Sequence, residues 1–479
     1  MNFSIIAYII GWILNCEAAI MILPCITAIV YRESQLRAFL ITMALCLALG
    51  IPLVSRSPKN RFFFIREGFV AVALSWIVLS IMGSLPFLIS GTIPNVIDAL
   101  FETVSGFTTT GASILPAVEP LPRSILFWRS FTHWIGGMGV LVFILAILPM
   151  TGGSQMSLMK AESPGPSVSK LMPRVQSTAK ILYVIYFCMT ILEIIFLLIG
   201  HMPLFDALTT AFGTAGTGGF GIKNDSIAGY STYIQVVVTI FMILFGINFG
   251  LYFLLISKKI KQAFALEEVR WYLSIILISI FIITLNIRGL YPSLGEAVNH
   301  ASFQVGSIIT TTGFATTDFN NWNQVSRSIL VILMFIGACA GSTGGGIKVS
   351  RLIIAVRTVK KELHQYIHPR SVKKVTIDGK PVEHEVVRAT NVFLVSYMLI
   401  FVFSVLLISF DGHDMITNFT SVAATLNNIG PGLELVGPTG NFGIFSIGAK
   451  IVLIFDMLAG RLEIFPLLLL FVPEAWRKF

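Results

Sequence analysis

The string Thr108-Thr109-Thr110-Gly111 recurs as Thr310-Thr311-Thr312-Gly313, and both copies lie within otherwise apolar sequence. Glycine adopts positive φ without a steric penalty, so a glycine at the end of such a string lets neighbouring carbonyls turn toward one axis. Rings of backbone carbonyls can replace the hydration shell of an alkali cation. The repeated string therefore raises the question of whether two further segments complete a ring of four.

The composition is that of a helical membrane protein. Of 479 residues, 55% are hydrophobic and 12% are charged, whereas about a quarter of the residues in a soluble protein are charged. Many apolar runs exceed the ~20 residues that a helix needs to cross a bilayer. The runs are continuous rather than alternating, which argues against a β-barrel. The net charge of +9 does not indicate nucleic acid binding, because the basic residues lie in short loops between apolar runs.

Long apolar runs alternate with four shorter, semi-polar stretches. We interpret the first run as a retained span, because it lacks the basic start and the cleavage site of a signal peptide. The semi-polar stretches are too short to cross a bilayer, which is typical of re-entrant half-helices followed by extended backbone. The predicted spans are 3–30, 36–54, 68–90, 124–150, 178–200, 231–257, 270–288, 326–362, 388–410 and 442–473, and the re-entrant stretches are 94–112, 203–220, 293–314 and 411–431.

This order predicts an all-α polytopic membrane protein. It contains four pseudo-symmetric repeats, each a helix, a re-entrant pore loop and a second helix, and two extra transmembrane helices precede them. The predicted divisions are 1–67 for the two N-terminal helices, 68–155 for repeat 1, 156–265 for repeat 2, 266–362 for repeat 3 with a broken second helix, and 363–479 for a cytoplasmic loop and repeat 4.

Each re-entrant helix is predicted to begin with an acidic residue and to run to a glycine at its tip. An acid at the helix start matches the positive end of the helix dipole, and the negative end then points at the tip, where a cation would lie. For one loop an ordinary helix cap would explain the acid, but four matched loops favour a pore. The acids are Asp98, Asp206, Glu296 and Asp414.

The four tips supply a candidate K⁺ filter. Potassium-channel filters use four copies of a TVGYG loop, whereas here four unequal loops lie on one chain. Polar turns or close helix packing are the alternative explanation. In the second tip, either Gly218 or Gly219 could match the glycine of the other tips. Gly219 is favoured, because it lies as far from Asp206 as Gly111 lies from Asp98. The candidate filter residues are Thr109, Thr110, Gly111, Thr217, Gly218, Gly219, Thr311, Thr312, Gly313, Asn428, Ile429 and Gly430.

Loop charges predict the orientation. The loops that join one repeat to the next are basic, so the positive-inside rule places them in the cytoplasm and the pore loops outside. We expect acids on the outer side to form a vestibule that concentrates cations. These acids are Glu102, Glu119, Asp225, Asp318, Asp411 and Glu434.

A glycine-rich segment interrupts the apolar run 326–362. A phosphate-binding Walker loop needs Lys directly after its last glycine, but Ile347 precedes Lys348 here, so nucleotide binding is disfavoured. Such a break at membrane depth is tolerated only against protein or a water-filled cavity. A passive kink is the alternative. The segment consists of Gly341, Ser342, Thr343, Gly344, Gly345 and Gly346.

Arg461 lies inside the last apolar run. A charge at that depth costs ~3 kcal/mol or more and usually faces a pore or a partner. Glu463 can pair with Arg461 only imperfectly, because residues two apart point to different faces of a helix. An ion pair with another helix is the alternative.

Together these motifs resemble the Trk/Ktr/HKT superfamily of potassium transporters, and within it the membrane subunits of bacterial Trk uptake systems. The resemblance covers essentially the whole chain, although Asn428 and Ile429 depart from the Thr-x-Gly pattern, so the ring cannot be truly fourfold. It implies that segment 341–346, with Lys348, acts as a gate beneath the filter, where Arg461 contributes a positive charge.

The resemblance also implies K⁺ uptake across the bacterial cytoplasmic (inner) membrane, with K⁺ as the transported ion, no bound cofactor and no enzymatic activity. It implies a homodimer and a cytoplasmic, nucleotide-binding, TrkA-like regulatory subunit. A proton- or sodium-coupled cation symporter is the alternative function. Such a carrier should contain a buried acidic relay, for which the few candidates are Glu17, Glu193, Asp456 and Glu463.

Overall fold

The computed structural model describes residues 1–56, 64–139 and 175–477, which are mostly helical. Within these ranges, six helices are long and apolar enough to cross a membrane, or seven if one bent pair forms a single span. Their outward faces carry exposed apolar side chains, such as Val395, Val402 and Phe403. Exposed apolar faces on helices of this length suit contact with lipid.

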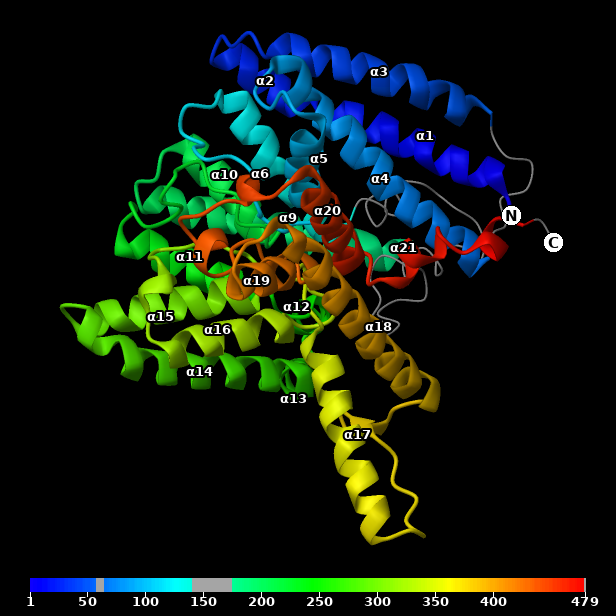
Figure 1. Cartoon of the computed structure of the whole chain (residues 1–479), viewed down its shortest axis with the longest axis vertical. Coiled ribbons are helices and arrows are strands. Elements are labelled where there is room, and N and C mark those ends of the chain that lie inside the picture. Colours follow the sequence, from blue (N-terminus) through cyan, green and yellow to red (C-terminus); the bar gives the residue numbers. More distant parts are fainter. Residues whose placement is uncertain (57–63, 140–174, 478–479) are drawn as a thin grey trace.

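The first helices form a layer beside the repeats (Figure 1). They are α1 (Phe3–Ile20), α2 (Ile22–Val30) and α3 (Leu36–Ser55). Close approach of α1 and α3 depends on Gly11 and Gly50, because a Cβ on either would collide with the other helix. The amino group of Met1 donates to the carbonyl of Arg477 at 3.3 Å, so the first and last described residues are in contact.

Each repeat contributes a first helix, a short pore helix and a second helix. Repeat 1 has α4 (Ile65–Ser90), α5 (Val96–Phe107) and α6 (Arg123–Met138); repeat 2 has α9 (Val175–Ile199), α10 (Leu204–Ala215), α11 (Thr232–Phe245), α12 (Phe249–Ile256) and α13 (Ile260–Ala265); repeat 3 has α14 (Glu267–Ile287), α15 (Leu294–Ile309), α16 (Gln324–Ile336) and α17 (Val349–Ile367); repeat 4 has α18 (His384–Ile408), α19 (Met415–Leu426), α20 (Ile447–Arg461) and α21 (Phe465–Leu469).

Short elements connect these helices. Strands β1 (Thr376–Ile377) and β2 (Lys380–Pro381) pair antiparallel between α17 and α18. Single 3₁₀ turns are η1 (Arg288–Leu290), η2 (Phe319–Asn321), η3 (Ser409–Asp411), η4 (Glu434–Val436), η5 (Phe442–Ile444) and η6 (Pro473–Trp476). Helix α17 extends away from the body of the protein (Figure 1), and the β1–β2 hairpin lies back against the start of α14, where the Glu267 N–H donates to Asp378 Oδ1 at 2.7 Å.

The repeats close into a ring. Each pore helix packs against the second helix of the preceding repeat: α10 against α6, α15 against α11, α19 against α16, and α5 against α20. The last of these contacts joins repeat 4 to repeat 1. The all-α fold class predicted from the sequence is confirmed. The predicted division at 155/156 lies outside the described residues, and the division boundaries stay predictions.

The second helices break at more places than the sequence predicted. The expected break follows α16, where Gly337 has φ 71°. However, α11 and α12, predicted as one span, meet at 89°. The last predicted span also ends early, because Glu463 and Ile464 after α20 have φ of 52° and 72°. Hydropathy averaged over a span reports that the segment is apolar and does not register a short turn within it.

The acids of the pore helices lie slightly inside the helices. Asp98, Asp206 and Glu296 occupy the first turn, and only Asp414 is itself the residue that caps its helix. Asn95 and Ser293 perform the capping of α5 and α15. Acids in the first turn still complement the positive end of the dipole, so the electrostatic argument for the tips is unchanged.

Candidate functional site

All four pore helices end in the same hydrogen-bonded turn. The backbone N–H of Thr110 donates to Ser105 O at 2.9 Å, and those of Gly218, Thr312 and Ile429 donate to the equivalent carbonyls, each at 2.8 Å. This six-to-one bond defines a Schellman ending, which places the preceding residue in the left-handed region. These preceding residues are Thr109, Thr217, Thr311 and Asn428, with φ of 56°, 53°, 60° and 55°.

A left-handed conformation is unusual for these residue types. It costs about 1–3 kcal/mol when the residue is not glycine, and such strain clusters at functional sites. A β-branched threonine makes it rarer still. Three threonines hold it here at matching places in three repeats, so the tips are strained in a repeated way.

The glycine that follows in each tip also has positive φ. The values are 78° for Gly111, 75° for Gly219, 85° for Gly313 and 101° for Gly430. Gly219, rather than Gly218, therefore occupies the shared position in the second tip, in agreement with its spacing from Asp206. In each of the four tips, therefore, two residues have left-handed backbone and one other residue lies between them.

The four glycines and four carbonyls form a closed ring. A Cβ built on Gly111 would collide with the carbonyl oxygen of Gly218, the residue before the next glycine. The same relation holds onward around the ring, so each tip lies against the next and the fourth meets the first. The remaining pairs are Gly219 with Thr312 O, Gly313 with Ile429 O, and Gly430 with Thr110 O.

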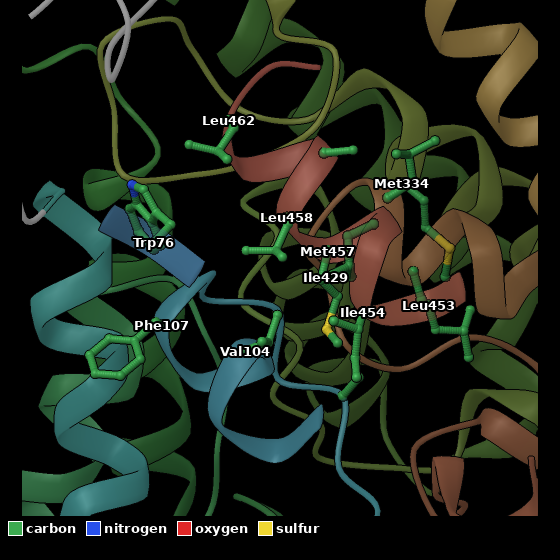
Figure 2. Packing of buried hydrophobic residues seen from close by; sticks show 14 of the residues in the cluster. Trp76, Val104, Phe107, Met334, Ile429, Leu453, Ile454, Met457, Leu458 and Leu462 are labelled. Carbon is green, nitrogen blue, oxygen red and sulfur yellow. The ribbon is translucent and has the colours of Figure 1, made fainter. Parts of the chain in front are cut away.

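The side chains of the fourth tip support the ring from outside. Ile429 is fully buried, and Figure 2 shows it beside Met457 and Ile454 of α20. The Asn428 amide donates to Thr110 Oγ1 and to Met457 O, both at 2.9 Å. The fourth tip therefore presents backbone to its neighbours while its side chains fix it to α20 and to the first tip.

A cavity of about 140 Å³ opens on the side of the ring formed by residues that follow the tips, and all four glycines line it. Its charged lining residues in the described part of the chain are Arg129 and Lys223. None of the six acids predicted to form the vestibule lines this cavity, and the acidic vestibule stays a prediction. Glu102 is only 1% exposed and pairs with Arg129 at 2.7 Å, because a carboxylate buried at this depth needs a partner.

The glycine-rich segment 341–346, here called the gate segment, lies against the tips on the opposite side from this cavity. Gly345 N–H donates to Thr311 Oγ1 at 2.6 Å, and Gly346 N–H donates to Asn427 O at 3.1 Å. The Thr343 hydroxyl donates to Phe245 O of repeat 2 at 3.2 Å. The segment thus contacts the third and fourth tips and the end of α11.

Arg461 connects the gate segment to repeat 1. Its guanidinium donates to Thr343 O at 3.0 Å, to Gly137 O at 2.8 Å and also to Gly136 O. Lys348 donates back to Gly344 O. The gate segment therefore contacts repeats 2, 3 and 4 directly and is linked to repeat 1 through Arg461. Glu463 pairs with Arg351 rather than with Arg461.

Sequence reasoning missed Glu268 of α14, which holds both flanks of the gate segment. Its Oε1 accepts from Ala340 N at 2.7 Å and from Ser350 N at 3.0 Å, and the side chain is buried. An acid at the start of an apolar span was the available signal. Because such an acid is also common at an ordinary helix start, the sequence did not predict its contacts with residues far along the chain.

Comparison with known proteins places the chain in a family. The TrkH family model, described as a cation transport protein, matches residues 35–478. The chain belongs to the TrkH family. Members of this family are classed by cation transport rather than by catalysis.

Relatives of the family match the chain from end to end. It is 40% identical over 488 residues to the "Trk system potassium uptake protein TrkH" of Salmonella typhimurium, with 100% of both chains covered. It is 34% identical to TrkG of Escherichia coli, covering 99% of each chain. The crystal structure of the potassium transporter TrkH from Vibrio parahaemolyticus superposes with a TM-score of 0.89 at 35% identity, again over 100% of both chains.

Proposed function

We propose that this chain carries K⁺ across the membrane as the membrane subunit of a potassium uptake system. Full-length TrkH relatives named for potassium uptake support the proposal. The single observation that carries it at the level of residues is the closed ring in which four glycines alternate with four backbone carbonyls. Such oxygens can replace the water around an alkali cation.

In this proposal the filter consists of the twelve tip residues from Thr109 to Gly430 named above. The negative ends of four pore helices lie at the tips and favour a cation there. The tips have one left-handed glycine each and unequal sequences, whereas TVGYG loops have two glycines. We therefore expect a shorter ordered filter and looser selection of K⁺ over Na⁺ than in a fourfold channel.

The gate segment, Lys348 and Arg461 control passage in this proposal. The gate segment is bonded to two tips and to α11, and Arg461 links it to α6. These bonds support the proposal that the segment obstructs the path below the ring. Opening requires these hydrogen bonds to break. The positive charges of Arg461 and Lys348 also repel a cation that leaves the filter, because like charges repel strongly where water is scarce.

A proton- or sodium-coupled symporter remains the second candidate. It draws on the buried acids Glu17 and Glu193, and the carboxylate oxygens of Glu17 have no hydrogen-bond partner among the described residues. Against it, Asp456 accepts from Ser404 at 2.7 Å and Glu463 pairs with Arg351, so two of the four candidate relay residues are held in local contacts.

We further propose that the pore loops face outward across the cytoplasmic membrane, that the chain forms a homodimer, and that a cytoplasmic nucleotide-binding subunit docks on the basic face. The extension formed by α17 offers that subunit a surface, since it is rich in Lys and Arg and carries exposed Leu363 and Tyr366. The relatives' designation as a "Trk system" fits an assembly of several components.

Growth complementation tests the proposal. The chain is expressed in bacterial cells that lack K⁺ uptake, with and without a TrkA-like subunit, and growth is measured at limiting K⁺. We expect rescue, and stronger rescue with the subunit. A normally expressed chain that supports no growth and no K⁺ uptake with either arrangement would contradict the proposal.

A further inference from the structure

The second tip lacks a pair of hydroxyls that the first and third tips carry. Thr108 and Thr110 share a hydrogen bond of 2.8 Å between their hydroxyls, and Thr310 and Thr312 share one of 2.7 Å. The common turn at the end of each pore helix aligns these pairs with two glycines of the second tip, Gly216 and Gly218. The second tip therefore needs another source of support.

The imidazole of His133, from α6 of the preceding repeat, fills the vacated space. The three atoms that a Cβ on Gly218 would meet first all belong to this ring, at colliding distances. Gly218 is not among the described residues with positive φ, so its backbone would accept other residues. The glycine at 218 is thus required by the imidazole rather than by backbone conformation.

Two hydrogen bonds fix the ring of His133, which is fully buried. Its Nδ1 lies 2.8 Å from Gly106 O, and because a carbonyl only accepts, Nδ1 carries the proton. Its Nε2 therefore accepts, and the N–H of Phe220 donates to it at 3.2 Å. His133 thereby links the pore helix of repeat 1 to the residue that follows Gly219.

Phe220 is held on its ring faces as well. Its ring centroid lies 4.3 Å from that of His133, and the Arg129 guanidinium lies 4.1 Å from the ring centroid. The backbone on both sides of the Gly219 carbonyl is therefore fixed, by the tip turn on one side and by His133 on the other.

We propose that His133 is a positioning residue of the ion filter: its imidazole replaces the missing hydroxyl pair of the second tip and fixes the backbone at Gly219, and so it contributes to the choice of K⁺ over Na⁺. This inference rests on the proposed function of the ring. It assigns to a residue outside the four tips a part in their selectivity.

The first test compares two replacements of His133 by the K⁺/Na⁺ permeability ratio, measured from reversal potentials in bilayers. His133→Gln can keep an acceptor for the Phe220 N–H, whereas His133→Leu keeps bulk without one. We expect the ratio to fall about tenfold, equivalent to about 1.4 kcal/mol, in the Leu variant and to be largely retained in the Gln variant. A Leu variant with the wild-type ratio would overturn the proposal.

The second test is a paired rescue. We expect Gly218→Ser alone to abolish K⁺ uptake, and His133→Ala together with Gly218→Ser to restore part of it. Gly216→Ser is the matched control, because its Cβ would meet the backbone carbonyl of His133, which His133→Ala leaves in place. Rescue at 218 but not at 216 supports the proposal. Rescue at both positions or at neither, with protein present in the membrane, counts against it.

A Gly313→Ser variant separates this inference from the proposed function. If Gly313→Ser lowers the permeability ratio and His133→Leu does not, only the role of His133 fails. If neither variant changes the ratio, the ring itself is not the filter.

Discussion

Residues at the tips have a strained backbone conformation and also contact the neighbouring tip. Thr109, Thr217 and Thr311 hold left-handed backbone, and each following glycine lies against a carbonyl of the next tip. Asn428 serves the fourth tip in the same conformation, since asparagine tolerates it better than most residues. This explains why a tip without threonine still completes the ring: the shared requirement is a backbone path rather than a hydroxyl.

Gly313→Ser should weaken discrimination of K⁺ against Na⁺. The new Cβ meets the Ile429 carbonyl, and φ of 85° disfavours any side chain, so the third and fourth tips must move apart. We expect the permeability ratio from reversal potentials to fall about tenfold, which corresponds to about 1.4 kcal/mol. Gly289→Ser is the control, because a Cβ there meets nothing within 4 Å. An unaltered ratio in Gly313→Ser would remove this residue from the filter.

Arg461→Ala should increase K⁺ flux. The substitution removes a charge below the ring together with the bonds to Thr343, Gly136 and Gly137. Tracer uptake into proteoliposomes measures the flux. Arg461→Lys keeps the charge, so its flux should lie between those of the wild type and the Ala variant. Lower flux in a normally folded Ala variant would count against repulsion and gating by this residue.

Among the helices, the breaks in the second helices of the repeats determine where residues that could control K⁺ passage come together. The end of α11 at Phe245, the gate segment after α16 and the end of α20 at Arg461 meet beneath the tips. Helices that continued straight would leave no backbone carbonyls there for Arg461 and Thr343 to bind. The broken helices therefore build the lower part of the site.

Glu268→Ala should loosen the gate segment. The carboxylate accepts from the N–H groups of Ala340 and Ser350 on its two flanks, and each hydrogen bond to a charged group contributes about 1.5–3 kcal/mol. We expect higher K⁺ flux through the Ala variant and near-normal flux through Glu268→Gln, which keeps an oxygen acceptor. If both variants had the flux of the wild type, the flanks of the gate segment would not need the hydrogen bonds to Glu268.

A feature of the fold or of the site could be predicted from the sequence where the residues that build it lie close together in the chain. The tips were found from their composition and their spacing from Asp98, Asp206, Glu296 and Asp414, and apolar length sufficed for the fold class. The roles of Glu268 and His133 depend on partners far along the chain, which no periodicity encodes. The bend between α11 and α12 escaped because Gly246, Ile247 and Asn248 break a helix without lowering hydropathy much.

The whole molecule is a ring of four repeats whose pore helices each pack against the preceding repeat, with N-terminal helices beside it and a basic extension on one side (Figure 1). Because neighbouring tips touch directly, we expect the four loops to act as one filter rather than as four separate sites. We therefore expect K⁺ to pass down its own gradient whenever the gate segment is displaced.

Removing Gly344 and Gly345 should expose this behaviour. The deletion shortens the gate segment and removes its bond to Thr311, so we expect greater K⁺ flux than in the wild type. Equal removal of two residues from the exposed loop near Val372 is the control. Flux unchanged by the deletion in the gate segment would show that this segment does not obstruct the pore.

The most direct measurement is the current of the purified chain, wild type and Gly344–Gly345 deletion, in planar bilayers with a K⁺ gradient, equal pH on both sides and no Na⁺. We expect a sustained current that reverses near the K⁺ equilibrium potential and is larger in the deletion variant. No current from either protein until a proton or sodium gradient is applied would contradict it and favour a coupled carrier.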